Sequence, residues 1–286
     1  MNSQTMPNYQ HILFPIDFSP QIDAAIPYVA AISRHLNAKV TLLSVVPAIW
    51  AGRGAKPEYA SELENATKER LDRALTAEVH GLAVERVVRS GEPAEEIIGF
   101  TQEHGVDLIM MPTHGYGRFR GLLLGSVTAK VLHDAHCPLW TAAHAAEQSA
   151  RHIPQTIICC VDGTQASVDL IRQAAQFSGR FDAALQLLYV VAPVSDWEGF
   201  ADDRQVQEEE RTIAHQLLDK LCTEAGVAAP FHIAVGSIAS TVAERAGEEA
   251  ADLLIIGRGK IGATLGRLRT HAQGIIQRSP CPVLSL

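Results

Sequence analysis

The chain has 286 residues, of which 47% are apolar and 20% are charged, and its formal net charge at pH 7 is −8. This length exceeds one average domain and suits two. The apolar content lets each half bury a full core, and the charged fraction excludes a generally disordered chain. The acidic balance argues against broad nucleic-acid binding, which needs a basic face. Binding of a single nucleotide is compatible with it, since that needs only a few local hydrogen-bond donors.

Features that mark cellular location point to the cytoplasm. No apolar run approaches the roughly 18 to 20 residues of a membrane span, and the polar residues 1–10 hold no apolar signal core. The cysteines match neither a zinc pattern nor a disulfide framework, and we expect them to be buried apolar residues in a reducing compartment; they are Cys137, Cys159, Cys160, Cys222 and Cys281. We therefore expect a cytoplasmic protein without a metal site and without a membrane or nucleic-acid partner.

In chain order, the first half alternates short apolar runs with longer amphipathic stretches. Ser19-Pro20 is expected to open the first helix, and Glu92-Pro93 the third. Near-continuous apolar strands are typical of parallel sheets that are buried on both faces, and strands alternating with helices indicate right-handed crossovers and a doubly wound sheet. The strands are predicted at 11–16, 40–46, 84–88, 106–111 and 138–142, and the helices near 20–36, 58–80, 93–104 and 125–135.

The second half of the chain repeats the first at a constant offset of 145 residues. The apolar run that ends in Asp17 matches the run that ends in Asp162, and Asp107 matches Asp252. Near the end of each half the offset becomes 144. We therefore predict two copies of one domain, at residues 1–145 and 153–286, joined by a short linker near 143–154.

The segment after the fourth strand, residues 112–126, has the composition of an anion-binding loop. Its glycines let backbone N–H groups approach a ligand closely, and Gly125-Ser126 precedes a helix whose N-terminus favours negative charge. Arg118 and Arg120 add positive charge. The loop is not a Walker P-loop, because the Gly-Lys-Ser/Thr ending is missing. On the residues alone, a surface loop whose glycines merely turn the chain is an equally good interpretation.

The spacing within this loop resembles a signature of the universal stress protein family, Gly-x2-Gly-x9-Gly-Ser/Thr after the fourth strand. Gly115, nine residues and then Gly125-Ser126 fit the second part of the signature, whereas Pro112 stands in place of its first glycine. The resemblance covers nearly the whole chain twice, as in the tandem members of the family.

The resemblance implies an ATP site in the first copy. Family members carry an Asp after the first strand and a Val at the end of the second, which match Asp17 and Val45 and imply contacts with adenine and ribose. The glycines of the loop, with Ser126 and Val127, would hold the phosphates, although Pro112 lacks one backbone donor. The nucleotide site expected in this way consists of Pro15, Asp17, Val45, Met111, Pro112, His114, Gly115, Gly125, Ser126 and Val127. Whether magnesium accompanies ATP is left open.

Enzymatic chemistry has little support in the sequence. His114 would donate to a phosphate oxygen or assist slow hydrolysis, and an exposed loop histidine is the alternative. No matched base, nucleophile and orienting group is recognisable, so we expect no catalytic residue and at most a slow ATPase.

The second copy departs from the signature. Counted back from Cys281, Arg269-Thr270 stands where the first copy has Gly125-Ser126. A guanidinium there would fill the phosphate position or bind a smaller anion, and we expect that nucleotide binding is lost.

The expected fold is α/β: two tandem doubly wound domains, each with a five-stranded parallel sheet in the order 3-2-1-4-5 flanked by helices. By resemblance, the two copies pair through their last strands and the chain forms a homodimer. The leading function is an ATP-binding stress-response or regulatory protein, with the second copy as a scaffold and an unknown protein as partner. The alternatives are a nucleotide-free interaction scaffold and a slow ATP hydrolase of the same superfold.

Overall fold

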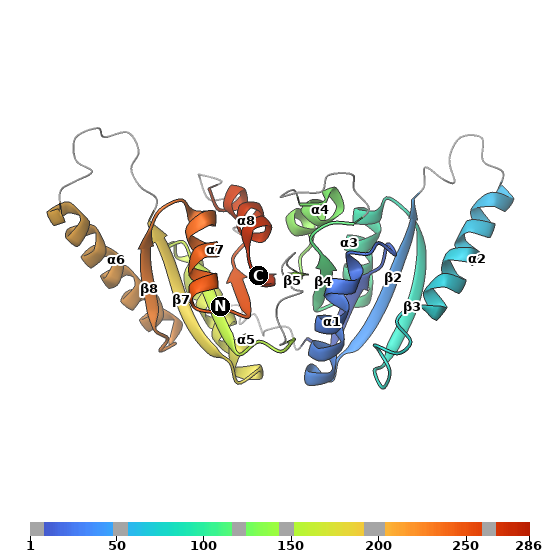
Figure 1. Ribbon diagram of the computed structural model, residues 1–286, viewed down its shortest axis with the longest axis horizontal. Helices are drawn as coiled ribbons and strands as arrows, with labels where there is room; N and C mark the ends of the chain where they lie inside the picture. Colours follow the sequence, from blue (N-terminus) through green and yellow to red (C-terminus); the bar gives the residue numbers. More distant parts are fainter. Residues whose placement is uncertain (1–8, 48–56, 116–123, 143–151, 192–203, 259–266) are drawn as a thin grey trace. The chain divides into compact units, whose positions relative to one another are not determined.

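A computed structural model of the chain describes residues 9–47, 57–115, 124–142, 152–191, 204–258 and 267–286, and of these it leaves out the side chains of 57–60, 204–210 and 267–270. The chain divides into two compact units, Met1–Ile153 and Pro154–Leu286 (Figure 1). Among the described residues, no helix combines the length and the apolar character that a membrane crossing requires.

The first unit is a parallel sheet with the strand order β3-β2-β1-β4-β5. This order confirms the predicted topology. Its elements are β1 His11–Pro15, α1 Ile22–Leu36, β2 Lys39–Pro47, α2 Pro57–Arg73, β3 Val84–Gly91, α3 Pro93–His104, β4 Leu108–Pro112, α4 Ser126–Asp134 and β5 Leu139–Ala142.

The second unit repeats this arrangement, with five parallel strands in the order β10-β9-β6-β7-β8. Counted from its own first strand, this is again 5-4-1-2-3, so the repeat in the sequence is a repeat of the fold. Its elements are β6 Thr156–Val161, α5 Ala166–Arg180, β7 Ala184–Val191, α6 Arg204–Ala225, β8 Phe231–Val235, α7 Ile238–Glu248, β9 Leu253–Ile256, α8 Arg267–Arg278 and β10 Val283–Ser285.

The apolar strands of both units form the core. In β1 and β4, the residues before the last are buried without exception, as expected for strands that helices cover on both faces. Right-handed crossovers place α1 and α2 on one face of the first sheet and α3 and α4 on the other, and α3 packs against α4. The helices of each unit therefore begin at the carboxyl ends of its strands.

A carboxylate joins the amino ends of the two central strands in each unit. In the first, Asp107 Oδ2 accepts hydrogen bonds from the backbone N–H groups of Gln10 at 2.8 Å and His11 at 2.9 Å. In the second, Asp252 Oδ2 accepts the same pair of bonds from Gln155 and Thr156, both at 3.0 Å. This clamp explains why both halves of the sequence place Asp immediately before the fourth strand.

Two helix boundaries differ from the sequence prediction. The first helix begins at Ile22 and not at Pro20, because the Ser19 carbonyl accepts the Ile22 N–H at 3.2 Å in a turn that precedes the helix. The second helix is predicted to extend to residue 80 but ends at Arg73. Two residues later, Leu75 adopts a left-handed φ of 56°, which is incompatible with a continuing helix. The third helix begins as predicted, with Glu92 as its N-cap and Pro93 at its first position.

All five cysteines are free thiols. The prediction that they are buried holds for Cys159 and Cys281, whereas Cys137, Cys160 and Cys222 are only partly buried. Burial raises the pKa of Cys281 to about 12, so this thiol stays protonated and unreactive near neutral pH.

Candidate functional site

The topology of the first unit creates a switch point between β1 and β4, because the chain leaves β1 toward β2 and leaves β4 toward β5. Ligands of open parallel sheets bind beyond the carboxyl ends of the strands at such a point. Pro15 and Pro112 are the last residues of β1 and β4, and Val45 lies in the half-buried last third of β2. Asp17 follows β1 by two residues and is exposed.

The end of β1 and the loop after β4 are in direct contact. The Asp17 carboxylate lies so close to the α-carbon of Gly115 that a side chain at position 115 would collide with Oδ2. Oδ1 of the same carboxylate accepts the backbone N–H of Ser19 at 2.9 Å. Asp17 is thus fixed at the switch point by a backbone donor, and the absence of a side chain at position 115 leaves room for its carboxylate.

The N-terminus of α4 packs against the start of this loop. Gly125 is the N-cap and donates its N–H to the Thr113 carbonyl at 2.9 Å. Its φ of −60° is open to every residue, so glycine is not required for its backbone conformation. A Cβ there would lie 3.1 Å from the α-carbon of His114, a tight contact that favours glycine at this position. The helix begins at Ser126.

Backbone donors are available at this helix start. Within the described part of the chain, no side chain caps α4, and its first turn holds no acidic residue. The N–H groups of Ser126 and Val127 belong to the first turn and have no acceptor inside the helix. The Ser126 side chain is exposed. Together with the helix dipole, these groups form a site for a negative charge.

The other predicted residues have mixed positions. Met111 is buried, with 5% of its surface exposed, so its side chain belongs to the core. Pro112 accepts a hydrogen bond from the Thr128 hydroxyl at 3.2 Å through its carbonyl, which attaches α4 to the end of β4. His114 is half-buried, with Nδ1 3.1 Å from the Thr113 hydroxyl. Arg118 and Arg120 lie outside the described residues.

Helix α3 begins at the same edge of the sheet, and its N-terminus is closed. The Glu92 carboxylate accepts the backbone N–H of Glu95 at 2.9 Å, and Glu95 and Glu96 occupy the first turn. From α4, Lys130 Nζ lies 2.9 Å from Glu95 Oε1 and 3.6 Å from Glu92 Oε2. Acids of its own therefore fill the anion-attracting end of α3, in contrast to that of α4.

The corresponding edge of the second unit engages its own side chains. Oδ1 of Asp162, the counterpart of Asp17, accepts the Thr164 N–H at 3.0 Å and the hydroxyls of Thr164 and Ser167, each at 2.7 Å. A Cβ at Gly163 would lie 2.9 Å from Leu217, and Tyr189 is also close. The counterpart of Ser167 in the first unit is Ile22, which has no hydroxyl to offer Asp17.

The last helix of the second unit also begins differently. α8 starts at Arg267, whereas the position that matches the start of α4 is Thr270. The match with Gly125 predicts Arg269 at the cap of the helix. The structure places it within the first turn instead. Its side chain lies outside the described residues.

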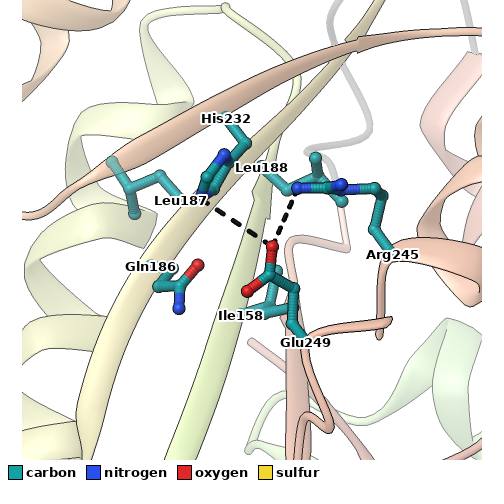
Figure 2. Close-up of a pocket in the computed structure, with 7 residues that line it drawn as sticks. All are labelled: Ile158, Gln186, Leu187, Leu188, His232, Arg245 and Glu249. Carbon is teal, nitrogen blue, oxygen red and sulfur yellow. Dashed lines mark hydrogen bonds and ion pairs between the residues drawn. The ribbon is translucent and has the colours of Figure 1, made fainter. Parts of the chain in front are cut away.

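The second unit has a small hollow at the opposite, amino-terminal edge of its sheet, below α7 (Figure 2). Its empty space is about 180 Å³, part of which is open solvent at its mouth. Arg245 donates to Glu249 Oε1 at 2.8 Å, and His232 Nε2 lies 4.0 Å from the same oxygen. Among the residues that the structure describes, the buried Gln186 side-chain oxygen has no hydrogen-bond partner, and one water molecule can serve as its partner.

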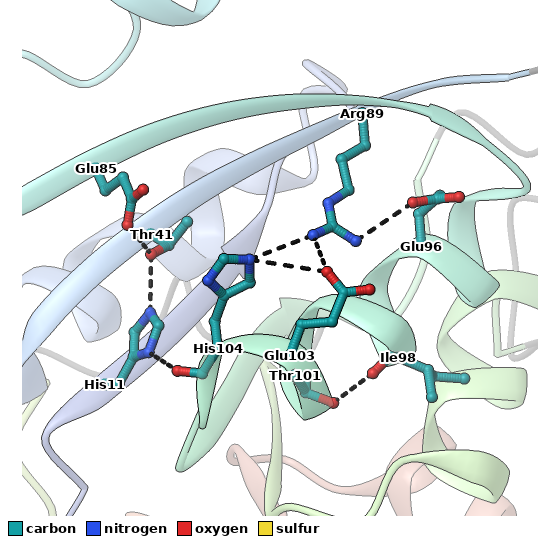
Figure 3. A network of polar contacts seen from close by, with 9 residues as sticks. All are labelled: His11, Thr41, Glu85, Arg89, Glu96, Ile98, Thr101, Glu103 and His104. Carbon is teal, nitrogen blue, oxygen red and sulfur yellow. Dashed lines mark hydrogen bonds and ion pairs between the residues drawn. The ribbon is translucent and has the colours of Figure 1, made fainter.

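A polar network around His11 in the first unit could not be predicted from the sequence (Figure 3). His11 lies in β1 with 4% of its surface exposed. Its Nδ1 donates to the His104 carbonyl at 3.2 Å, and its Nε2 lies 2.8 Å from the Thr41 hydroxyl, which in turn lies 3.4 Å from Glu85 Oε2. Burial, and then the charge of Lys39, lower the pKa of His11. The network fixes α3 on the sheet, and no local sequence signal reveals it.

These features define a class: a doubly wound α/β domain that occurs twice in one chain, with a helix start at the switch point of the first copy that no described side chain caps. The sequence profile of the universal stress protein family matches residues 8–142 and again residues 154–286. The chain therefore belongs to the universal stress protein family and carries two of its domains in tandem.

Individual relatives agree with this assignment. A universal stress protein of Mycolicibacterium smegmatis is 26% identical over 207 residues, or 69% of each chain. One of Methanocaldococcus jannaschii is 28% identical over 150 residues, which cover 46% of this chain and 93% of that protein. The crystal structure of a universal stress protein from Archaeoglobus fulgidus shares the fold at a TM-score of 0.68 and 20% identity, over 96% of this chain and 95% of that one.

Proposed function

We propose that the first domain binds ATP at the carboxyl edge of its sheet and that the protein acts as a nucleotide-dependent regulatory protein. The observation that carries the proposal is the uncapped N-terminus of α4 beside the contact between Asp17 and Gly115. It supplies backbone donors for phosphate and, a short distance away, a carboxylate acceptor for ligand hydroxyl or amino groups.

In this proposal, Asp17 and Val45 face the adenosine part of ATP, and the loop glycines with Ser126 and Val127 face the phosphates. Pro15, Met111, Pro112 and His114 shape the strand ends between them. Magnesium is proposed only as a companion of the phosphates. The homodimer and the protein partner stay predictions.

We propose a scaffolding role for the second domain. Asp162 already accepts three hydrogen bonds on one oxygen from its own turn and helix, and a ligand would have to compete with them. Side chains of β7 and α6 pack close to Gly163. Both features support a second domain that keeps its fold without a nucleotide.

The test is to denature the purified protein, quantify released nucleotide by chromatography and mass, and then titrate nucleotide-free protein with ATP by calorimetry. We expect one ATP per chain. Gly125→Arg should reduce binding at least a hundredfold, because its Cβ would press against the His114 backbone and its long side chain would fill the helix start proposed for the phosphates. Gly247→Arg is the matched control, since a Cβ there meets nothing within 4 Å.

The stoichiometry decides between the two domains. Two ATP per chain would show that the second domain binds as well, and undiminished binding in Gly125→Arg would move the site away from α4. Absence of binding in the wild-type protein, with and without magnesium, would leave the nucleotide-free scaffold. Multiple-turnover phosphate release would indicate a hydrolase.

A further inference from the structure

Lys130, Glu92 and Glu95 form a charged cluster at the carboxyl edge of the first sheet, called the Lys130 cluster below. The lysine belongs to α4 and both acids belong to the start of α3. The ammonium lies 2.9 Å from Glu95 Oε1 and 3.6 Å from Glu92 Oε2. The cluster carries two negative charges and one positive charge.

Lys130 lies one helical turn after the uncapped start of α4. Lys130 follows Ser126 by four residues, so the two side chains share one face of the helix. Long helical side chains lean back over the preceding turn, which here is the turn that contains Ser126 and Val127. Lys130 is therefore the described cation best placed on α4 to meet a phosphate held at its N-terminus.

The ion pairs in the cluster are weak enough for a ligand to compete with them. The side chains of Lys130, Glu92 and Glu95 are 40%, 49% and 67% exposed, and exposed pairs of this kind contribute little to stability. The hydrogen bond to Glu95 raises the pKa of Lys130, so the ammonium stays charged at neutral pH. Without it, two carboxylates would face the phosphates with no neutralising charge.

The second domain lacks the whole cluster. The positions that match Glu92 and Glu95 are Ser237 and Ser240, and the position that matches Lys130 is Gly274. A Cβ at Gly274 would lie 3.2 Å from the Cβ of Ala239, so α7 and α8 pack closely at the position that matches Lys130. The cluster is therefore present beside the uncapped start of α4 in the first domain and absent beside the start of α8 in the second.

We infer that the Lys130 cluster sets how the first domain discriminates nucleotides by the number of their phosphates. Lys130 neutralises the local acids and attracts the outer phosphates, while Glu92 and Glu95 limit the affinity for polyphosphates. The inference rests on the proposed nucleotide site and assigns a specificity-determining role to three residues around it. It predicts changes in ATP affinity of opposite sign: loss of the Lys130 charge weakens ATP binding, and loss of the Glu95 charge strengthens it.

The experiment measures the affinities of the full-length protein for ATP, AMP and adenosine by calorimetry at low ionic strength, with EDTA present. Lys130→Met should weaken ATP binding about tenfold and AMP binding about threefold, because each lost charge acts on all phosphate charges nearby. Glu95→Gln should tighten ATP binding by about threefold. Neither substitution should change adenosine binding. Lys220→Met, which removes an exposed lysine that pairs with Glu224 at 3.8 Å in the second domain, is the matched control.

Each outcome decides the matter. An ATP affinity in Lys130→Met equal to that of Lys220→Met would overturn the inference and leave the nucleotide site standing. Equal losses for ATP and adenosine would also overturn it, since they would mean that Lys130 only holds α4 in place. A wild-type protein that binds none of the three ligands would refute the proposed function, and the inference with it.

Discussion

Asp107→Ala is expected to lower the free energy of unfolding of the first domain by about 3 kcal/mol. The carboxylate accepts the N–H groups of Gln10 and His11 at 2.8 and 2.9 Å, and a hydrogen bond to a charged group contributes about 1.5–3 kcal/mol. The Gln10 bond is exposed, so its N–H regains water when the carboxylate is removed. The His11 bond is partly buried and accounts for the larger share of the loss.

Urea unfolding, followed by circular dichroism, measures this effect, and the second domain supplies an internal replicate. Asp252→Ala removes the same two bonds from Gln155 and Thr156 and should cost a similar amount. Asp219→Ala is the control, because Asp219 is exposed on α6 and alanine favours the helix. Losses below about 1 kcal/mol for both Asp107→Ala and Asp252→Ala would refute the view that these carboxylates hold the central strands together.

Two further predictions concern stability. Gly105 (φ 60°) and Ala250 (φ 48°) occupy the same left-handed position after equivalent helices. Gly105→Ala should therefore destabilise the protein and Ala250→Gly should stabilise it, each by roughly 0.5–1 kcal/mol. Thermal unfolding measures both changes, and shifts of the same sign would contradict the prediction. Because the folded-state pKa of His11 is lowered from 6.5, the unfolded chain binds more protons below that pH. The contribution of neutral His11 is complete above about pH 6.5 and declines as the pH falls below it. The loss of unfolding free energy caused by His11→Thr, measured by urea unfolding, should therefore be smaller at low pH than at neutral pH. A larger loss at low pH would show that His11 is charged in the folded protein.

The repeat allowed the fold to be predicted in detail. Its constant offset indicated two copies of one domain. The alternation of apolar strands with amphipathic stretches predicted a doubly wound sheet in each copy, and the order 3-2-1-4-5 was expected for that class of fold. The periodicity of strands and helices depends only on neighbouring residues, so it can be read directly from the sequence. The match between Asp107 and Asp252 was also visible there, but only the structure shows that each carboxylate receives two backbone N–H groups from a strand about 97 residues away.

The helix boundaries and the electrostatics were less accessible. The end of α2 depends on the left-handed conformation of Leu75, for which leucine gives no signal. The Lys130 cluster joins two helices whose contact depends on tertiary packing. For the same reason, the sequence could not show that Ser167 donates to Asp162 while its counterpart Ile22 has nothing to donate.

The clamps at the amino ends of the strands bear on how this chain tolerates change. Both domains keep the carboxylate there, while their carboxyl ends differ in the residue beside the strand-end Asp, in the start of the last helix and in the charges around it. One edge of each sheet thus maintains the fold and the other is open to divergence. A mutational scan should therefore find both amino-terminal edges equally intolerant, with sensitivity at the opposite edge confined to the first domain and to conditions in which its ligand matters.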